Sequence, residues 1–106
     1  QSMKSYYVDL TPKAQRDISS ILNYIAIDLC APSASLNLNT KILEQIERLE
    51  TFPLCGEVYI SEIPLKREYR RLVVDNYLIF YTVNEATETI TIMHVVYGAS
   101  NYLSIL

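Results

Sequence analysis

The feature that most constrains the fold is a change in the spacing of apolar residues near the middle of the chain. Between residues 11 and 49 they recur every three or four positions, which is the period of an amphipathic α-helix. From residue 57 to residue 97 they fall in short runs rich in Val, Ile, Thr and Tyr, which are typical of β-strands. A chain of 106 residues has the size of one domain, so both halves should share one core.

Two helices are predicted in the first half of the chain. Thr11 followed by Pro12 is a typical helix start, because a hydroxyl can cap the helix and proline fits its first position. The apolar stripe of this helix is Ala14, Ile18, Ile21, Leu22, Ile25 and Leu29. After a break at residues 31–33, we expect Ser33 to cap a second helix. Its expected buried stripe is Leu38, Ile42, Leu43, Ile46 and Leu49. The short break predicts an antiparallel helical hairpin.

The predicted strands lie on both sides of this hairpin. They are residues 4–10, 69–74, 77–83 and 89–97, with 57–60 as a short additional candidate and a tail at 101–106 that could be helical. The predicted fold is therefore α+β in the order β-α-α-β-β-β, with the helical hairpin packed on one face of a mostly antiparallel sheet. We expect the second face of the sheet to be open to water or to a partner.

Charge and composition narrow the class of protein. The net charge of −3 weighs against a general nucleic-acid binder, although a local basic patch is compatible with it. Apolar runs are far below the roughly 20 residues of a membrane span, and no signal-peptide pattern is present, so we expect a cytoplasmic protein. Cys30 and Cys55 lack C-x-x-C spacing and are expected to be buried free thiols. Gln1 and Ser2 are interpreted as the remnant of an expression tag, which leaves residues 3–106 as one domain.

One short segment concentrates positive charge in this acidic chain. Four of the nine basic residues lie within six positions, namely Lys66, Arg67, Arg70 and Arg71. Side chains alternate along a strand, so Arg70 and Arg71 should point to opposite faces of the sheet. If Leu72 and Val74 face the helices, Arg70 lies on their side and Arg71 lies on the open face with Tyr69. We expect Arg70 to be structural, with an ion pair to a helix carboxylate as one option, and Arg71 to be the exposed functional arginine. The alternative is that both arginines only cap a solvated strand edge.

His94 is the single histidine, and it lies within the predicted strand 89–97. No Cys, Asp or Glu converges on it in the sequence, so it is a poor metal ligand candidate. An ordinary strand residue is the favoured interpretation, with a general base as the alternative. No metal or cofactor is expected.

The order and spacing of these elements resemble the RelE/ParE superfamily of bacterial toxins from type II toxin–antitoxin systems. Three stretches carry the resemblance: "VDLTPKAQRDISSILNYI", "ILEQIERLETFPLCG" and "YRRLVVDNYLIFYTVNEATETITIMHVVYG". The resemblance covers residues 3–106. It implies a small cytoplasmic toxin that is neutralised when a cognate antitoxin wraps a segment around it. RelE-like members enter the ribosome and cleave mRNA with basic side chains on the concave sheet face, whereas ParE-like members lack that basic set and poison DNA gyrase.

The basic positions of RelE-like nucleases can be compared with this chain one by one. Cleavage by the ribose 2′-OH needs guanidinium or ammonium groups aimed at the developing negative charge. In the family's "Y-R-x-x-Y" strand Leu78 occupies the arginine position, and in its "G-[RK]-R" pattern Ser100 occupies the second basic position. Arg71 matches a position that is often lysine in active nucleases, and Arg70 matches the arginine of the "Y-R-x-L" pattern found in both classes. Tyr102 lies where some members keep a tyrosine near the substrate, although packing is its expected role.

Three functions therefore remain open at the level of sequence. The chain could be a ribosome-dependent mRNA endonuclease that relies on Arg71 with Lys66 and Arg67. It could instead inhibit DNA gyrase through surface complementarity, or it could be a degenerate member that only binds an antitoxin. The residues expected to contact a substrate or partner are Lys66, Arg67, Tyr69, Arg70 and Tyr102.

Overall fold

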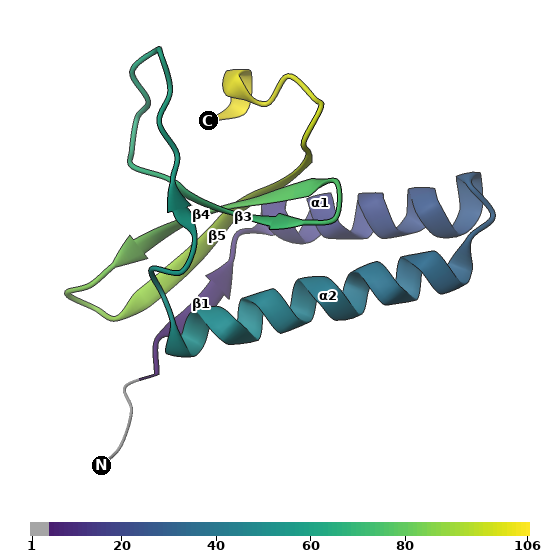
Figure 1. Ribbon diagram of the computed structural model, residues 1–106, viewed down its shortest axis with the longest axis horizontal. Helices are drawn as coiled ribbons and strands as arrows, with labels where there is room; N and C mark the ends of the chain where they lie inside the picture. Colours follow the sequence, from purple (N-terminus) through teal and green to yellow (C-terminus); the bar gives the residue numbers. More distant parts are fainter. Residues whose placement is uncertain (1–4) are drawn as a thin grey trace.

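The computed structural model describes residues 5–106, in which two helices lie side by side along one face of a five-stranded sheet (Figure 1). The elements in chain order are β1 (Tyr7–Leu10), α1 (Pro12–Asn23), the π-helical turn η1 (Tyr24–Asp28), α2 (Pro32–Thr51), β2 (Glu57–Val58), β3 (Arg70–Val74), β4 (Tyr77–Asn84), β5 (Thr89–Tyr97) and the 3-10 turn η2 (Leu103–Ile105). The predicted α+β class and element order are confirmed. The tag residues Gln1 and Ser2 and the predicted start of the first strand at Lys4 lie outside the described residues.

Helix α1 begins as its sequence predicts. The Thr11 hydroxyl oxygen accepts a hydrogen bond of 3.0 Å from the backbone N–H of Ala14, and Pro12 occupies the first turn. The helical stretch continues beyond Asn23 as η1, where the N–H of Leu29 donates to the carbonyl of Tyr24 at 3.0 Å, five residues back. Cys30 then ends the stretch with a φ of 52°.

Helix α2 differs from the prediction in two details. Its N-cap is Ala31, which makes no side-chain hydrogen bond, so the prediction of a Ser33 cap is wrong. Pro32 already occupies the first turn, because its fixed φ suits that position, and Ser33 therefore lies inside the helix. Leu38, Ile42 and Leu49 are buried as predicted, but Leu43 is 55% exposed, because one residue beyond Ile42 is about 100° around the helix.

The sheet has the strand order β1-β5-β4-β3-β2, so the first and last strands are neighbours. Strand β1 pairs with β5 in parallel, and the other neighbours are antiparallel. Strand β5 has the predicted bounds, β3 and β4 differ by one residue each, and β2 is shorter than its candidate range. Asp75, with a φ of 53°, lies in the predicted tight turn between β3 and β4.

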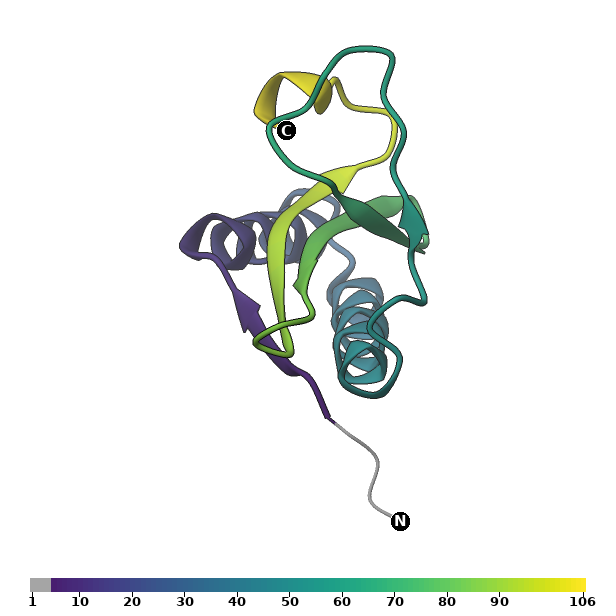
Figure 2. The ribbon, with the colours of Figure 1, turned by 90° about the vertical axis from the view of Figure 1, so that its left-hand side faces the viewer.

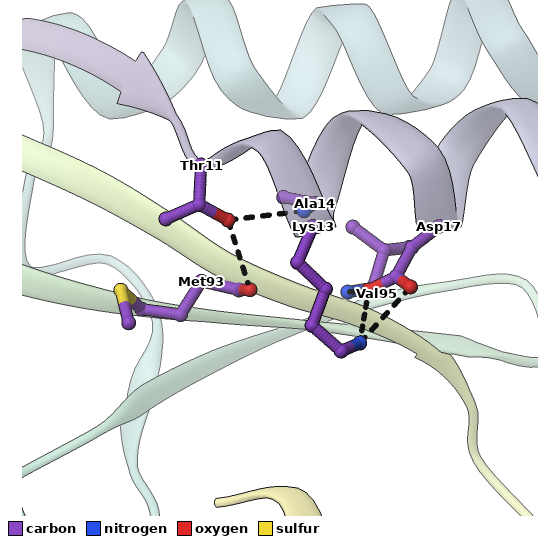
Figure 3. Close-up of polar contacts among 6 residues, drawn as sticks. All are labelled: Thr11, Lys13, Ala14, Asp17, Met93 and Val95. Atoms are coloured by element: carbon purple, nitrogen blue, oxygen red, sulfur yellow. Dashed lines mark hydrogen bonds and ion pairs between the residues drawn. The ribbon is translucent and has the colours of Figure 1, made fainter.

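The start of α1 completes the edge of β5 at the point where β1 ends (Figure 3). The Thr11 hydroxyl donates to the carbonyl of Met93 at 3.2 Å, and the Val95 N–H donates to Asp17 Oδ2 at 3.0 Å. Asp17 also pairs with Lys13, whose Nζ lies 2.9 Å from the carboxylate. This edge lies beside a β-bulge, because Phe80 pairs with His94 while Tyr81 pairs with Ile92. Side chains of one helix thus replace a missing strand neighbour.

The two faces of the sheet carry separate apolar clusters. The face toward the helices holds the larger one, which includes Ile42, Leu49, Ile79, Tyr81 and Ile92. The opposite face, which we call the outer face, buries Tyr69, Leu78, Phe80 and Leu106 beneath the loop of residues 59–69 and the C-terminal tail. Both segments lie at the same end of the molecule (Figure 2). The prediction of an open second face therefore holds only in part, because apolar side chains from these irregular segments cover part of it while Val73 on the same face is 65% exposed.

The free cysteines also differ from the prediction. Cys55 is half-buried, but Cys30 is exposed, because it lies in the turn between the two helices rather than on an apolar stripe. None of the helices in residues 5–106 combines the length and the apolar character that a bilayer crossing requires.

Candidate functional site: the outer face of the sheet

Arg70 and Arg71 lie on opposite faces of β3, as the alternation of side chains requires. Arg70 faces the helix side, where its Nη1 donates hydrogen bonds to the carbonyls of Gly56 at 2.7 Å and Leu54 at 3.3 Å. The expected option of an ion pair with a helix carboxylate is wrong, because the segment after α2 provides backbone carbonyls instead. Arg70 therefore fastens that segment to the sheet.

Arg71 lies on the outer face, opposite Phe80 in the β3–β4 register. Its guanidinium carbon is 5.3 Å from the centre of the Tyr59 ring, an arrangement that a cation–π attraction stabilises. No carboxylate within residues 5–106 forms an ion pair with it. The alternative in which both arginines only cap a strand edge does not fit, because β2 pairs with β3 at both positions.

Lys66 and Arg67 are exposed in the loop before β3. They line a surface cavity of about 620 Å³ together with Arg70 and the end of β4. The carboxylates of Glu68 and Glu85 line the same cavity, whereas Arg71 does not. Three of the four clustered basic residues therefore share this cavity, and Arg71 lies outside it.

Leu78 occupies the centre of the outer face, where it is 8% exposed. It belongs to the same apolar cluster as Phe80, whose ring centre is 5.2 Å from that of Tyr102. Tyr102 also meets the Tyr59 ring, at 6.1 Å between centres. Ser100 is exposed and its hydroxyl donates to the carbonyl of Tyr97 at 2.6 Å. The two positions that carry arginine in RelE-like nucleases are thus an apolar contact and a turn hydrogen bond.

Tyr59 and Tyr69 are part of the packed layer beneath the exposed outer face. Tyr69 is 2% exposed, and its hydroxyl donates to the carbonyl of Leu106 at 3.4 Å. Burial, followed by the neighbouring Tyr102 hydroxyl, raises the pKa of Tyr59 above its usual value of 10.0. Tyr59 therefore stays protonated at neutral pH, and its ring acts as a support for Arg71.

His94 is the residue whose surroundings the sequence did not reveal. It is 7% exposed, and its Nδ1 has no hydrogen-bond partner within residues 5–106. Burial is the main cause that lowers its pKa below 6.5; the charges of Lys13 and Arg67 add to this, and Asp17 opposes it. The imidazole is therefore neutral at pH 7. Lys13 and Asp17 are about eighty positions away in the chain, so no local signal could have placed them beside it.

Residues 5–106 contain no group of three or more His, Cys, Asp or Glu side chains that could hold a metal ion. On the outer face, one half-exposed guanidinium lies beside an apolar, largely aromatic cluster.

The fold is shared with chains of solved toxin–antitoxin structures. It is similar to a chain of a chromosomal ParDE toxin–antitoxin system from P. aeruginosa, with a TM-score of 0.68, 22% identity and coverage of 88% of this chain and 96% of the other. A chain of the RelBE2 toxin–antitoxin complex from Mycobacterium tuberculosis has a TM-score of 0.63, 20% identity and coverage of 93% and 98%. A chain of the archaeal RelE–RelB complex from Pyrococcus horikoshii OT3 has a TM-score of 0.63, 19% identity and coverage of 90% and 97%.

One family profile also matches the sequence. The profile of the family described as "ParE toxin of type II toxin-antitoxin system, parDE" matches residues 8–102. The chain therefore belongs to the ParE toxin family, and the predicted membership of the RelE/ParE superfamily is confirmed. No sequence among the curated proteins matches the chain significantly.

Proposed function

We propose that this protein is a cytoplasmic toxin that arrests growth by binding DNA gyrase, without cleaving RNA, and that a cognate antitoxin neutralises it. The observation that carries the proposal is the burial of Leu78 within an apolar cluster at the centre of the outer face. A RelE-like nuclease would have an arginine there, by the resemblance described above. RNA cleavage needs several cations aimed at one phosphate, and Arg71 does not line the cavity that Lys66, Arg67 and Arg70 share with Glu68 and Glu85.

Family membership and the structural neighbours support the two proposed protein partners, which are gyrase and an antitoxin. Membership of the ParE toxin family favours gyrase as the target, because ParE-like members lack the basic set of the nucleases. The structural neighbours come from toxin–antitoxin complexes, which favours an antitoxin partner for this chain as well.

Induction of the chain in bacteria tests the proposal directly. Growth should stop, primer extension on total mRNA should show no new 5′ ends, and purified protein should block supercoiling by gyrase. Coexpression of the neighbouring antitoxin gene should restore growth. Unimpaired growth would instead identify a module that only binds an antitoxin.

The nuclease remains the second candidate because the Arg71 guanidinium is half-exposed and lacks an ion pair within residues 5–106. Arg71→Ala separates the two functions, with Arg16→Ala on the exposed side of α1 as a matched control. Under the proposal, mRNA should stay uncleaved with the wild type and with both variants. New mRNA 5′ ends with the wild type that disappear only with Arg71→Ala would contradict it.

A further inference from the structure

The loop of residues 59–69 projects at the same end of the molecule as the C-terminal tail (Figure 1), and it exposes two large apolar side chains. Ile60 is 86% exposed and Ile63 is 52% exposed. We call these two side chains the apolar crest. Ile60 is more exposed than any other large apolar residue of the described chain. Exposed apolar residues are common, so these two isoleucines are a candidate contact surface whose role depends on the groups near them.

The loop that exposes these side chains is held in place by hydrogen bonds and by packing. At its base the N–H of Tyr59 donates to the carbonyl of Tyr69 at 2.8 Å, and at its tip the N–H of Ile63 donates to the Ser61 hydroxyl at 3.2 Å. Leu65 on the returning limb packs into the outer-face cluster. The loop thus buries one of its aliphatic side chains and holds two others in solvent. A held side chain loses less conformational entropy when it binds than a free one.

Charged groups of both signs share the loop with the crest. Lys66 and Arg67 in the loop, and Arg71 against Tyr59 at its base, have no ion-pair partner within residues 5–106, so their charges remain available to a partner. Glu62 lies between the two isoleucines in sequence, and Glu68 follows the basic pair. These carboxylates weaken the attraction of the loop for the phosphates of a nucleic acid or an anionic membrane. An apolar centre with mixed charges around it is instead typical of a protein–protein interface.

We propose that the apolar crest is the surface with which this toxin binds its target protein. Ile60 and Ile63 enter an apolar pocket of the target, and carboxylates at the rim of that pocket meet Lys66, Arg67 and Arg71. This inference rests on the proposed function in one respect, namely that the target is a protein. It adds the location of the contact and the chemistry of the surface that receives it.

The test compares two double variants that remove equally exposed apolar side chains. Ile60→Ser with Ile63→Ser removes the crest, and Leu36→Ser with Leu43→Ser removes two leucines of α2 that are 68% and 55% exposed. Both variants should keep the wild-type melting temperature, because the substituted side chains project into solvent. The crest variant should need at least about tenfold more protein to inhibit gyrase and should no longer arrest growth. The α2 variant should behave as the wild type in both assays, which are performed without antitoxin.

Charge reversal provides a second measurement. Lys66→Glu with Arg67→Glu should weaken inhibition severalfold and reverse its dependence on salt concentration, since steering by opposite charges is lost. Equal activity of the crest variant and the wild type would overturn the inference, and so would an equal loss of activity in the α2 variant. Binding of the wild type, but not of the crest variant, to anionic phospholipid vesicles would overturn it in favour of a membrane surface.

The assays separate this inference from the proposed function. If the wild type arrests growth but leaves gyrase unaffected, the proposed target is wrong, while growth arrest by the crest variant still decides the role of the crest. If the wild type does not arrest growth, both proposals fail.

Discussion

The two faces of the sheet differ in what covers them. The helix face is covered by α1 and α2, and its cluster of buried residues is mostly aliphatic. The outer face is covered by the loop of residues 59–69 and the C-terminal tail, and rings dominate its contacts. Phe80, for example, meets the rings of Tyr59, Tyr69 and Tyr102. One face is therefore sealed by regular secondary structure, and the other by segments with few backbone hydrogen bonds of their own.

This difference indicates where the molecule can change shape at low cost. Segments with few buried contacts and few backbone hydrogen bonds open more easily than helices and central strands. The helix face should therefore determine global stability, and the outer face should be the part that adapts to partners.

The sharpest test of this comparison uses two adjacent residues of β4 that face opposite sides. Ile79 is 0% exposed in the helix-face cluster, and Leu78 is 8% exposed in the outer-face cluster. Ile79→Ala should lower the free energy of unfolding by about 4 kcal/mol, because helices and strands around the cavity cannot collapse into it. Leu78→Ala should cost about 2 kcal/mol, because irregular segments can close over the gap. Urea denaturation measures both values, and an equal or larger loss for Leu78→Ala would break the comparison.

The two arginines of β3 allow the two faces of the sheet to be compared with polar side chains. Arg70→Met should destabilise the protein by about 2 kcal/mol, because the charged hydrogen bonds to the Gly56 and Leu54 carbonyls are lost. Arg71→Met should cost below about 1 kcal/mol, the range of an exposed cation–π contact. Thermal melting at one pH compares the variants, each with the long aliphatic stem preserved. The assignment of Arg70 as the structural arginine would be wrong if the order were reversed.

The smallest expected effect concerns pH and His94. Its folded-state pKa is lowered from 6.5, so below that pH the unfolded chain binds the proton more readily than the folded chain. Stability from this group is therefore complete above pH 6.5 and declines as the pH falls from 6.5 toward the lower folded-state pKa. His94→Gln removes this contribution, so its melting temperature should fall less than that of the wild type between pH 7.5 and pH 5.5. Parallel curves for the two proteins would contradict the lowered pKa.

The elements of the fold could be predicted from the sequence because their signals are local. The Thr11–Pro12 start, the apolar period of the helices and the composition of residues 89–97 each need only a short window. The failures were of two kinds. Ser33 was misplaced because the second helix starts two residues earlier than expected. Leu43 was misplaced because it lies about 100° around the helix from the buried Ile42.

The other failures depended on contacts between distant parts of the chain. The alternation of side chains separated Arg70 from Arg71, but the carbonyls that bind Arg70 lie 14 and 16 residues away, in a segment without regular structure. The cover of the outer face could not be predicted, because it depends on how Leu65 and Tyr102 return to the sheet. Tertiary packing of irregular segments leaves no periodic signal in the sequence.

The parallel pairing of β1 with β5 has a consequence for how the chain folds as it is synthesised. Val8 pairs with Ile90, and Asp17 accepts a hydrogen bond from the N–H of Val95. The contacts of β1 and of the start of α1 therefore require residues 90–95. Contacts across such sequence separations form late in folding, because a long loop must close first. A nascent chain that has not yet exposed β5 outside the ribosome has neither the edge that β1 needs nor the partner of Asp17. The pairing of β1 with β5 and the hydrogen bond from Val95 to Asp17 therefore cannot form until residues 89–97 have left the ribosome.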